Sequence, residues 1–258
     1  MADRSIVDVN VWLGSWPYQY FELDTARRLE NHLAAEGISR ALVGSPEAAF
    51  NPDCMASNRL LLKRLGRGGT LRPVLAVDPT KGDWKDILSL ARDEGAPAVR
   101  LFPNYHTYEL DSTPALAAVE AAAAAGLALI VQMRVEDERT HHILCKIPGV
   151  QASAVSGLAR RYPRLPVIAA CVYYHEAVEL AKQPPNLRID LSYVETLRTV
   201  DSLLKEVPQE RVLFGSHTPF LQTRAAVMKL RAPYVPEATQ RAIASENALS
   251  FLGQALGE

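Results

Sequence analysis

Residues 98–133 read AVRLFPNYHTYELDSTPALAAVEAAAAAGLALIVQM, and this stretch alone predicts a strand–helix–strand unit. Two short apolar runs, Ala98–Phe102 and Leu127–Met133, flank an alanine-rich run. Thr113 is a residue type that caps helix N-termini, and Gly126 suits the position after a helix end. Uninterrupted apolar runs are typical of parallel strands that are buried on both faces. The stretch therefore indicates parallel β/α architecture.

The same alternation extends along the chain in both directions. The predicted strands are short and apolar, and they lie at Ile6–Asn10, Arg40–Val43, Arg72–Val77, Ala98–Phe102, Leu127–Met133, Val167–Cys171, Leu187–Leu191 and Val212–Gly215. Helices are predicted between them and after the last strand, at Asp24–Glu36, Ser57–Leu65, Asp83–Glu94, Thr113–Ala125, Ala152–Tyr162, His175–Lys182, Val200–Glu206, Thr223–Leu230, Pro236–Ala244 and Ser245–Leu252. This pattern predicts one (β/α)8 TIM barrel over residues 1–258, a single domain with extra C-terminal helices. A doubly wound sheet is the alternative, but no phosphate-binding glycine motif follows any predicted strand.

Composition and charge argue against several classes of function. The chain has 28 basic and 29 acidic residues and a net charge of −1, so a basic surface for nucleic acid is not expected. The longest uncharged apolar stretch, Ala121–Met133, is too short to span a membrane. The N-terminus lacks the apolar segment of a signal peptide, and the scattered Cys54, Cys145 and Cys171 suit a reducing compartment. We expect a cytoplasmic protein with a small-molecule substrate and no nucleic-acid or membrane partner; a homo-oligomer stays open.

The C-terminal ends of the predicted strands concentrate polar residues. In a TIM barrel the functional site lies at these ends. The candidates for contacting a ligand are Asn10, Trp12, Arg100, Asn104, His106, Tyr108, Asp137, Arg139, His141 and Tyr193. The candidates for catalysis are Gln132, Arg134 and His217.

Three segments resemble the amidohydrolase superfamily, in its branch of small amidohydrolase-related barrels. Residues 6–14, IVDVNVWLG, are similar to the family's first strand, D-x-H-x-H-x-G. Residues 211–220, RVLFGSHTPF, are similar to the last strand, R-[LV]-[LM]-[FY]-G-S-D-x-P, and residues 245–253, SENALSFLG, are similar to the C-terminal N-A-x-x-[LF]-[LF]. The resemblance implies a barrel enzyme of the hydrolase type, with decarboxylases in a related branch.

The resemblance also implies metal ligands that this chain does not keep. The family binds one or two divalent metals through two histidines after strand 1, one after strand 5, one after strand 6 and an aspartate after strand 8. The matching positions here carry Asn10, Trp12, Gln132, Cys171 and His217. Amide and indole groups are poor zinc ligands. We therefore expect no metal cofactor; the alternative is an atypical zinc site that would draw on His106, His141, Cys171 and His217.

The resemblance places His217 where the family has the aspartate that activates water. An imidazole with an ordinary pKa near 6.5 can serve as a base without metal, and a hydrogen-bonded loop histidine is the alternative. Arg100 and Arg134, expected at the rim, are suited to holding a carboxylate or a developing oxyanion; structural ion pairs are the alternative. Gln132 and Arg134 alternate along one strand end, so both could reach one face. Trp12 either fills the metal cavity or stacks on a flat substrate.

The leading interpretation is a metal-independent hydrolase of a small polar or carboxylated molecule, such as an amide or a lactone. A non-catalytic binding or scaffold barrel and a decarboxylase-type lyase are the alternatives. A hydrolase should gather Arg100, Arg134 and His217 around one open pocket, whereas a scaffold should have Trp12 closing the barrel mouth. A lyase should have a dry pocket without a base that activates water.

Overall fold

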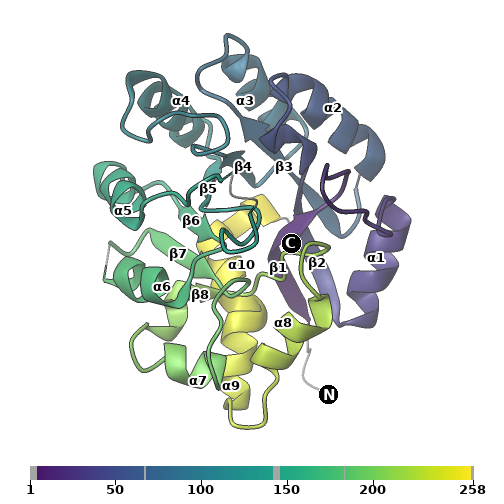
Figure 1. The fold of residues 1–258 in the computed structure, drawn as a ribbon, viewed down its shortest axis with the longest axis vertical. Helices are drawn as coiled ribbons and strands as arrows, with labels where there is room; N and C mark the ends of the chain where they lie inside the picture. The colour runs from purple at the N-terminus through teal and green to yellow at the C-terminus, as the bar shows by residue number, and fades with distance from the viewer. Residues whose placement is uncertain (1–4, 67, 142–145, 183, 257–258) are drawn as a thin grey trace.

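The computed structural model describes residues 5–66, 68–141, 146–182 and 184–256, which form the predicted single-domain barrel (Figure 1). Eight parallel strands pair in chain order from β1 to β8. The N–H of Val9 donates to the carbonyl of Phe214 at 3.0 Å, and the N–H of Trp12 donates to that of Thr218 at 2.8 Å. The chain after β8 therefore returns to β1 and nearly closes the barrel.

The strands agree with the predicted ones to within two residues at each end. Their bounds are β1 Ile6–Trp12, β2 Ile38–Gly44, β3 Leu71–Val77, β4 Ala98–Leu101, β5 Ala128–Gln132, β6 Val167–Ala170, β7 Leu187–Asp190 and β8 Val212–Leu213.

Helices surround the strands (Figure 1). They are α1 Ala26–Ala35, α2 Cys54–Leu65, α3 Trp84–Asp93, α4 Thr113–Ala124, α5 Ala152–Arg161, α6 Tyr174–Ala181, α7 Thr199–Leu203, α8 Thr223–Leu230, α9 Glu237–Arg241 and α10 Asn247–Leu252. Ser112, rather than Thr113, occupies the N-cap position of α4. A π-helical turn, Ala242–Glu246, joins α9 to α10, so the two predicted C-terminal helices are nearly continuous. Among the described residues, no helix is long and apolar enough to cross a membrane.

The interior of the barrel is apolar toward the N-terminal ends of the strands. Val9, Leu42, Ala98 and Ile130, from four different strands, belong to one buried cluster. Leu252 of α10 joins the same cluster, and Figure 1 shows α10 lying across the barrel. The extra C-terminal helix therefore covers the end of the barrel opposite the mouth.

The interior becomes polar toward the C-terminal ends of the strands. Side chains alternate between the two faces of a strand, so Arg100 lies on the same face as Ala98, and Gln132 on the same face as Ile130. Both polar side chains are buried. The candidate site is thus an internal layer of the barrel, stacked on the apolar one.

Candidate functional site

Seven residues from six strands or strand ends meet at the barrel mouth. Each of them is at most 1% exposed to solvent. We call this group the central cluster, and its members are Asn10, Trp12, Arg100, Gln132, Cys171, Asp190 and His217. The structure thus brings together five of the predicted site residues. Asp190 was not predicted, although its place at the end of β7 is a signal that could have found it.

His217 has both ring nitrogens engaged. Its Nε2 lies 2.7 Å from the carbonyl oxygen of Val135, which can only accept, so Nε2 carries the proton. Its Nδ1 accepts from the indole N–H of Trp12 at 3.0 Å. Burial lowers the pKa of His217 to about 3. The side chain is therefore a neutral, hydrogen-bonded imidazole rather than a base open to solvent.

Trp12 fills the mouth of the barrel. Its side chain is fully buried, and its ring meets those of His217 and Phe220 edge-on, with centroids 5.6 and 5.9 Å away. Gly44 lies beneath it, where a Cβ atom would come within 3.3 Å of the indole. The tryptophan thus closes the mouth, as expected of a scaffold or binding barrel.

Aromatic side chains from four loops cover Trp12 further. Trp16 contacts Phe50 and Phe220, with ring centroids 4.9 and 5.1 Å away. Phe21 packs on Phe220 at 4.9 Å, and Tyr105 packs on Phe50 at 5.2 Å. Trp16 and Tyr105 were expected as wall or covering residues of the mouth, whereas Phe21, Phe50 and Phe220 were not predicted, because the members of the cover are scattered through the loops after β1, β2, β4 and β8.

Arg100 is buried inside the barrel, and the expectation that it lies at the rim is wrong. Its Nη1 donates to Oδ1 of Asn10 at 3.1 Å and to Oε1 of Gln132 at 3.0 Å. Asn10 in turn donates from Nδ2 to Asp190 at 2.7 Å. Asp190 also accepts from the backbone N–H of Cys171 at 2.9 Å. A chain of hydrogen bonds therefore links β4, β5, β1 and β7.

Cys171 is a buried thiol surrounded by donors. Its Sγ lies 3.1 Å from Nε2 of Gln132, 3.2 Å from Nδ2 of Asn10 and 3.4 Å from Oγ of Ser192. Burial, reinforced by Asp190, raises the pKa of the thiol to about 12. Cys171 is therefore a protonated member of the network at neutral pH.

The residues of the central cluster do not fit a divalent metal. The amide oxygens of Asn10 and Gln132 already accept from Arg100, and the free lone pair of His217 faces the indole N–H of Trp12. Within the described ranges, no three His, Cys, Asp or Glu side chains are placed to hold a metal ion. Nor do the histidines of the alternative zinc site converge: His106 donates from Nε2 to the carbonyl of Ala48 at 2.8 Å, and Nδ1 of His141 accepts from the N–H of Ile147 at 3.4 Å.

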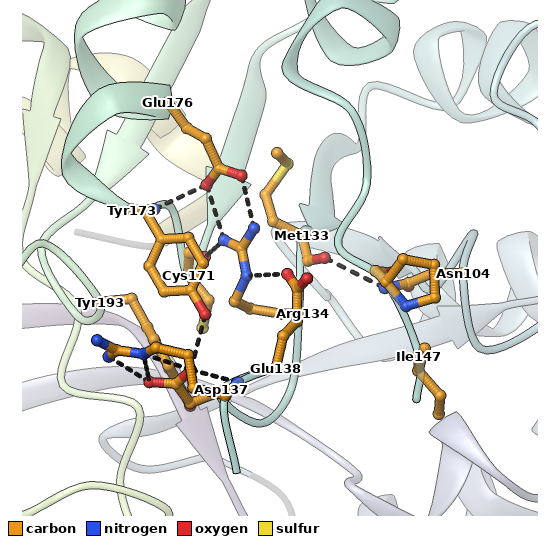
Figure 2. A network of polar contacts seen from close by, with 12 residues as sticks. Asn104, Met133, Arg134, Asp137, Glu138, Ile147, Cys171, Tyr173, Glu176 and Tyr193 are labelled. Atoms are coloured by element: carbon orange, nitrogen blue, oxygen red, sulfur yellow. Dashed lines mark hydrogen bonds and ion pairs between the residues drawn. The ribbon is translucent and has the colours of Figure 1, made fainter. Parts of the chain in front are cut away.

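Arg134 is also buried rather than at the rim, and Figure 2 shows how its guanidinium is used. It binds both oxygens of Glu176, at 2.8 and 2.6 Å, and its Nε donates to Glu138 at 3.0 Å. Its Cζ lies 3.9 Å from the ring centroid of Tyr173. Glu176 was not predicted; its place in the first turn of the helix after β6 was the available signal. Arg134 forms the structural ion pair of the alternative interpretation.

Asp137, Arg139 and Tyr193 lie beside this network. Arg139 is exposed and pairs with Asp137 at 2.5 Å, and Asp137 also accepts from the hydroxyl of Tyr173 at 2.9 Å. Tyr193 is buried, and its hydroxyl donates to the carbonyl of Val135 at 3.3 Å. The three residues hold the loop after β5 in place.

The remaining candidates lie away from the central cluster. Nδ1 of His106 is 3.9 Å from Oδ2 of Asp78, and the ring of Tyr108 lies 6.4 Å from that of His106. Cys54 is buried, as a structural thiol should be, whereas Cys145 falls outside the described residues. His106 and Tyr108, in the loop after β4, therefore lie toward Asp78 at the end of β3 rather than at the barrel centre.

A cavity of about 940 Å³ opens between the loops after β4 and β5. We call it the rim pocket, and its lining comes from residues 103–105, 107–111, 146–151 and 153–154. Asn104 joins the two loops, because its Nδ2 donates to the carbonyl of Met133 at 3.2 Å (Figure 2) and to that of Pro148 at 2.8 Å. Asn104 and Tyr108 are the predicted site residues that line it.

The model of the amidohydrolase family matches residues 15–254. The chain belongs to this family. The match begins just after β1, the strand that carries Asn10 and Trp12. No curated protein matches the chain.

Solved structures of decarboxylases and of a probable hydrolase resemble the chain in fold. The 2,6-dihydroxybenzoate decarboxylase from Rhizobium is 15% identical, with a TM-score of 0.74, over 96% of this chain and 98% of that one. A dihydroxybenzoic acid decarboxylase from Polaromonas, with bound manganese and 2-nitroresorcinol, is 13% identical, with a TM-score of 0.73, over 97% of both chains. A probable 2-pyrone-4,6-dicarboxylic acid hydrolase from Acinetobacter baumannii, with bound citric acid, is 13% identical, with a TM-score of 0.65, over 96% of this chain and 99% of that one.

We predict that the purified protein carries far less than one zinc or manganese ion per chain. The reason is that the amide oxygens and the imidazole lone pair at the family's ligand positions already have hydrogen-bond partners. Elemental analysis after purification without chelator measures this directly. Stoichiometric metal that survives dialysis would contradict the prediction.

We predict that His217 makes stability depend on pH. Its pKa is about 3 when folded and near 6.5 when unfolded, so the unfolded chain binds the extra proton between these values and stability falls as the pH drops. The contribution of His217 should decrease by roughly 2 kcal/mol between pH 7 and pH 5. Denaturant unfolding of the wild type and His217→Asn should therefore show a difference that shrinks toward acid pH.

The exposed His175 provides the matched control. The difference in unfolding free energy between the wild type and His175→Asn should change little over the same pH range. An equally constant difference for His217→Asn would mean that His217 is not held neutral in the folded state.

Proposed function

We propose that the chain is a small-molecule-binding barrel that performs no hydrolysis or decarboxylation at its centre. The observation that carries this proposal is the fully buried Trp12, whose N–H occupies the lone pair of His217. A catalytic base must reach the proton that it removes, and both nitrogens of His217 are turned to the protein instead. Arg134 is neutralised by Glu176 and Glu138. In this proposal the centre stabilises the fold, and the ligand binds at the rim.

The lining of the rim pocket suggests the class of ligand. Lys146 offers a cation for a carboxylate, while Glu109 and Asp111 can accept hydrogen bonds from hydroxyl groups. Tyr105 and Pro148 offer flat apolar surface between these polar groups. We therefore propose a small hydroxylated carboxylic acid. The dihydroxybenzoates named for the decarboxylase structures belong to that class, which supports the proposal by analogy of fold only.

Arg134 has a place in this proposal as a support of the pocket wall. A Cβ atom at Gly149 would lie 2.5 Å from Nη2 of Arg134 and 2.5 Å from Oε1 of Glu138. The neighbouring N–H of Val150 donates to the carbonyl of Met133 at 2.9 Å. The wall thus rests directly on a buried guanidinium that Glu176 holds in place. A wall held in this way reduces the ordering cost of binding a ligand.

Gly149→Ala should weaken ligand binding by about tenfold, which corresponds to about 1.4 kcal/mol. The added methyl group cannot fit against Arg134 unless the wall moves. Calorimetric titration with 2,6-dihydroxybenzoate and related hydroxybenzoates measures the effect. Gly157→Ala is the matched control, because Gly157 lies on α5 and a Cβ atom there meets open space. Equal affinities for the two variants, or no binding of any hydroxylated carboxylic acid, would remove the rim pocket as the ligand site.

Turnover assays separate this proposal from the hydrolase and lyase alternatives. Supplied with excess Mn²⁺ or Zn²⁺, the protein should neither hydrolyse a lactone panel nor decarboxylate a hydroxybenzoate panel. The His217→Asn substitution should therefore change no measurable turnover. Turnover by the wild type that falls 10²-fold or more in His217→Asn, the usual scale of general base catalysis, would establish an enzyme acting at the barrel centre.

A further inference from the structure

We propose that the guanidinium of Arg100 is the resident cation of the barrel mouth and joins the strand ends that a divalent metal would otherwise join. Arg100 comes from β4, and one of its nitrogens, Nη1, donates to Asn10 on β1 and to Gln132 on β5. Both acceptors stand at positions that correspond to metal ligands in the family pattern. Hydrogen bonds from one cation therefore hold two strand ends that coordination would hold in a metal site.

Trp12, at a third such position, also contacts the guanidinium. The Cζ of Arg100 lies 4.0 Å from the centroid of the indole ring. Nε and Nη2 of Arg100 are buried and find no hydrogen-bond partner among the described residues. The electron-rich face of the indole is thus their electrostatic partner, and a desolvated cation–π contact of this kind is strongly attractive.

The charge of Arg100 is balanced through an amide rather than by direct contact. Arg100 can only donate and a carboxylate can only accept, which fixes the orientation of Asn10 between them. Asp190 receives Nδ2 of Asn10 on one oxygen and the N–H of Cys171 and the hydroxyl of Ser192 on the other. Burial raises the pKa of Asp190, but every neighbour donates to it, so the ionised carboxylate is the form that the network fits. Asn10 therefore links a buried cation to a buried anion.

This arrangement and a divalent metal exclude one another. A metal held by the oxygens of Asn10 and Gln132 would compete with Arg100 for the same lone pairs. It would also lie beside the guanidinium, where two positive charges in a desolvated layer repel strongly. In this chain, two of the residues at the family's metal-ligand positions therefore bind Arg100 in place of a metal.

A double-mutant cycle of Arg100→Met and Asp190→Asn tests the proposal by thermal unfolding. Arg100→Met leaves the Asp190 carboxylate uncompensated, and adding Asp190→Asn removes that charge and lets the Asn10 amide turn round to accept from the new amide. We expect the double variant to unfold roughly 4–8 °C above Arg100→Met, equivalent to about 2 kcal/mol for a chain of this size. If the destabilisation of the double variant equals the sum of those of the two single variants, the proposed link from Arg100 through Asn10 to Asp190 is wrong.

Arg100→Lys decides the matter if Arg100→Met does not fold. This substitution keeps the positive charge and part of the hydrogen bonding. The variant should therefore fold, and its unfolding temperature should lie below that of the wild type and above that of Arg100→Met. A lysine variant as unstable as the methionine variant would overturn the proposal. Excess Mn²⁺ should leave the unfolding temperature of the wild type unchanged, and a rise on adding Mn²⁺ would show that metal and Arg100 coexist.

Discussion

The hydrogen bond from the indole of Trp12 to Nδ1 of His217 determines what the barrel mouth can do. It takes the one lone pair that could have served as a base or as a metal ligand. It also holds the tryptophan in the buried barrel mouth, at a position that corresponds to a metal ligand in the family pattern. Arg100 stacks on the indole from the barrel interior, and the aromatic side chains of the loops cover it from outside. The Arg100 guanidinium, the His217 imidazole and the aromatic cover therefore all contact the same ring, that of Trp12.

Strand β5 and the residues after it connect this closed centre to the open rim. Gln132 faces inward and accepts from Arg100, whereas the carbonyl of Met133 receives Asn104 and Val150 from the walls of the rim pocket. Arg134 then binds Glu176 and supports Gly149. The same three-residue stretch, 132–134, thus stabilises the centre and shapes the pocket, so in the proposed function a rigid centre would hold the pocket wall in place.

The sequence predicted the barrel well and the site only in part. Alternating apolar runs and helix boundary residues define the elements to within a few residues, because both signals are local. The ends of the strands also singled out Asn10, Arg100 and Gln132, which the structure places in one buried layer rather than at an open rim. The partner of Arg134 is 42 residues away along the chain, and the aromatic cover comes from four separate loops. Such pairings depend on which residues the fold brings together, and a local sequence pattern does not show this. The neutral state of His217 depends on its burial, which a local pattern does not show either.

The most direct measurement is the ¹⁵N NMR spectrum of the His217 ring as a function of pH, assigned with the His217→Asn variant. A closed, metal-free centre predicts the tautomer with the proton on Nε2, a slowly exchanging Trp12 indole N–H, and no titration of the ring down to about pH 4, since burial lowers its pKa to about 3. A ring that titrates near the ordinary 6.5, or carries its proton on Nδ1, would contradict a closed centre and restore His217 as an available base.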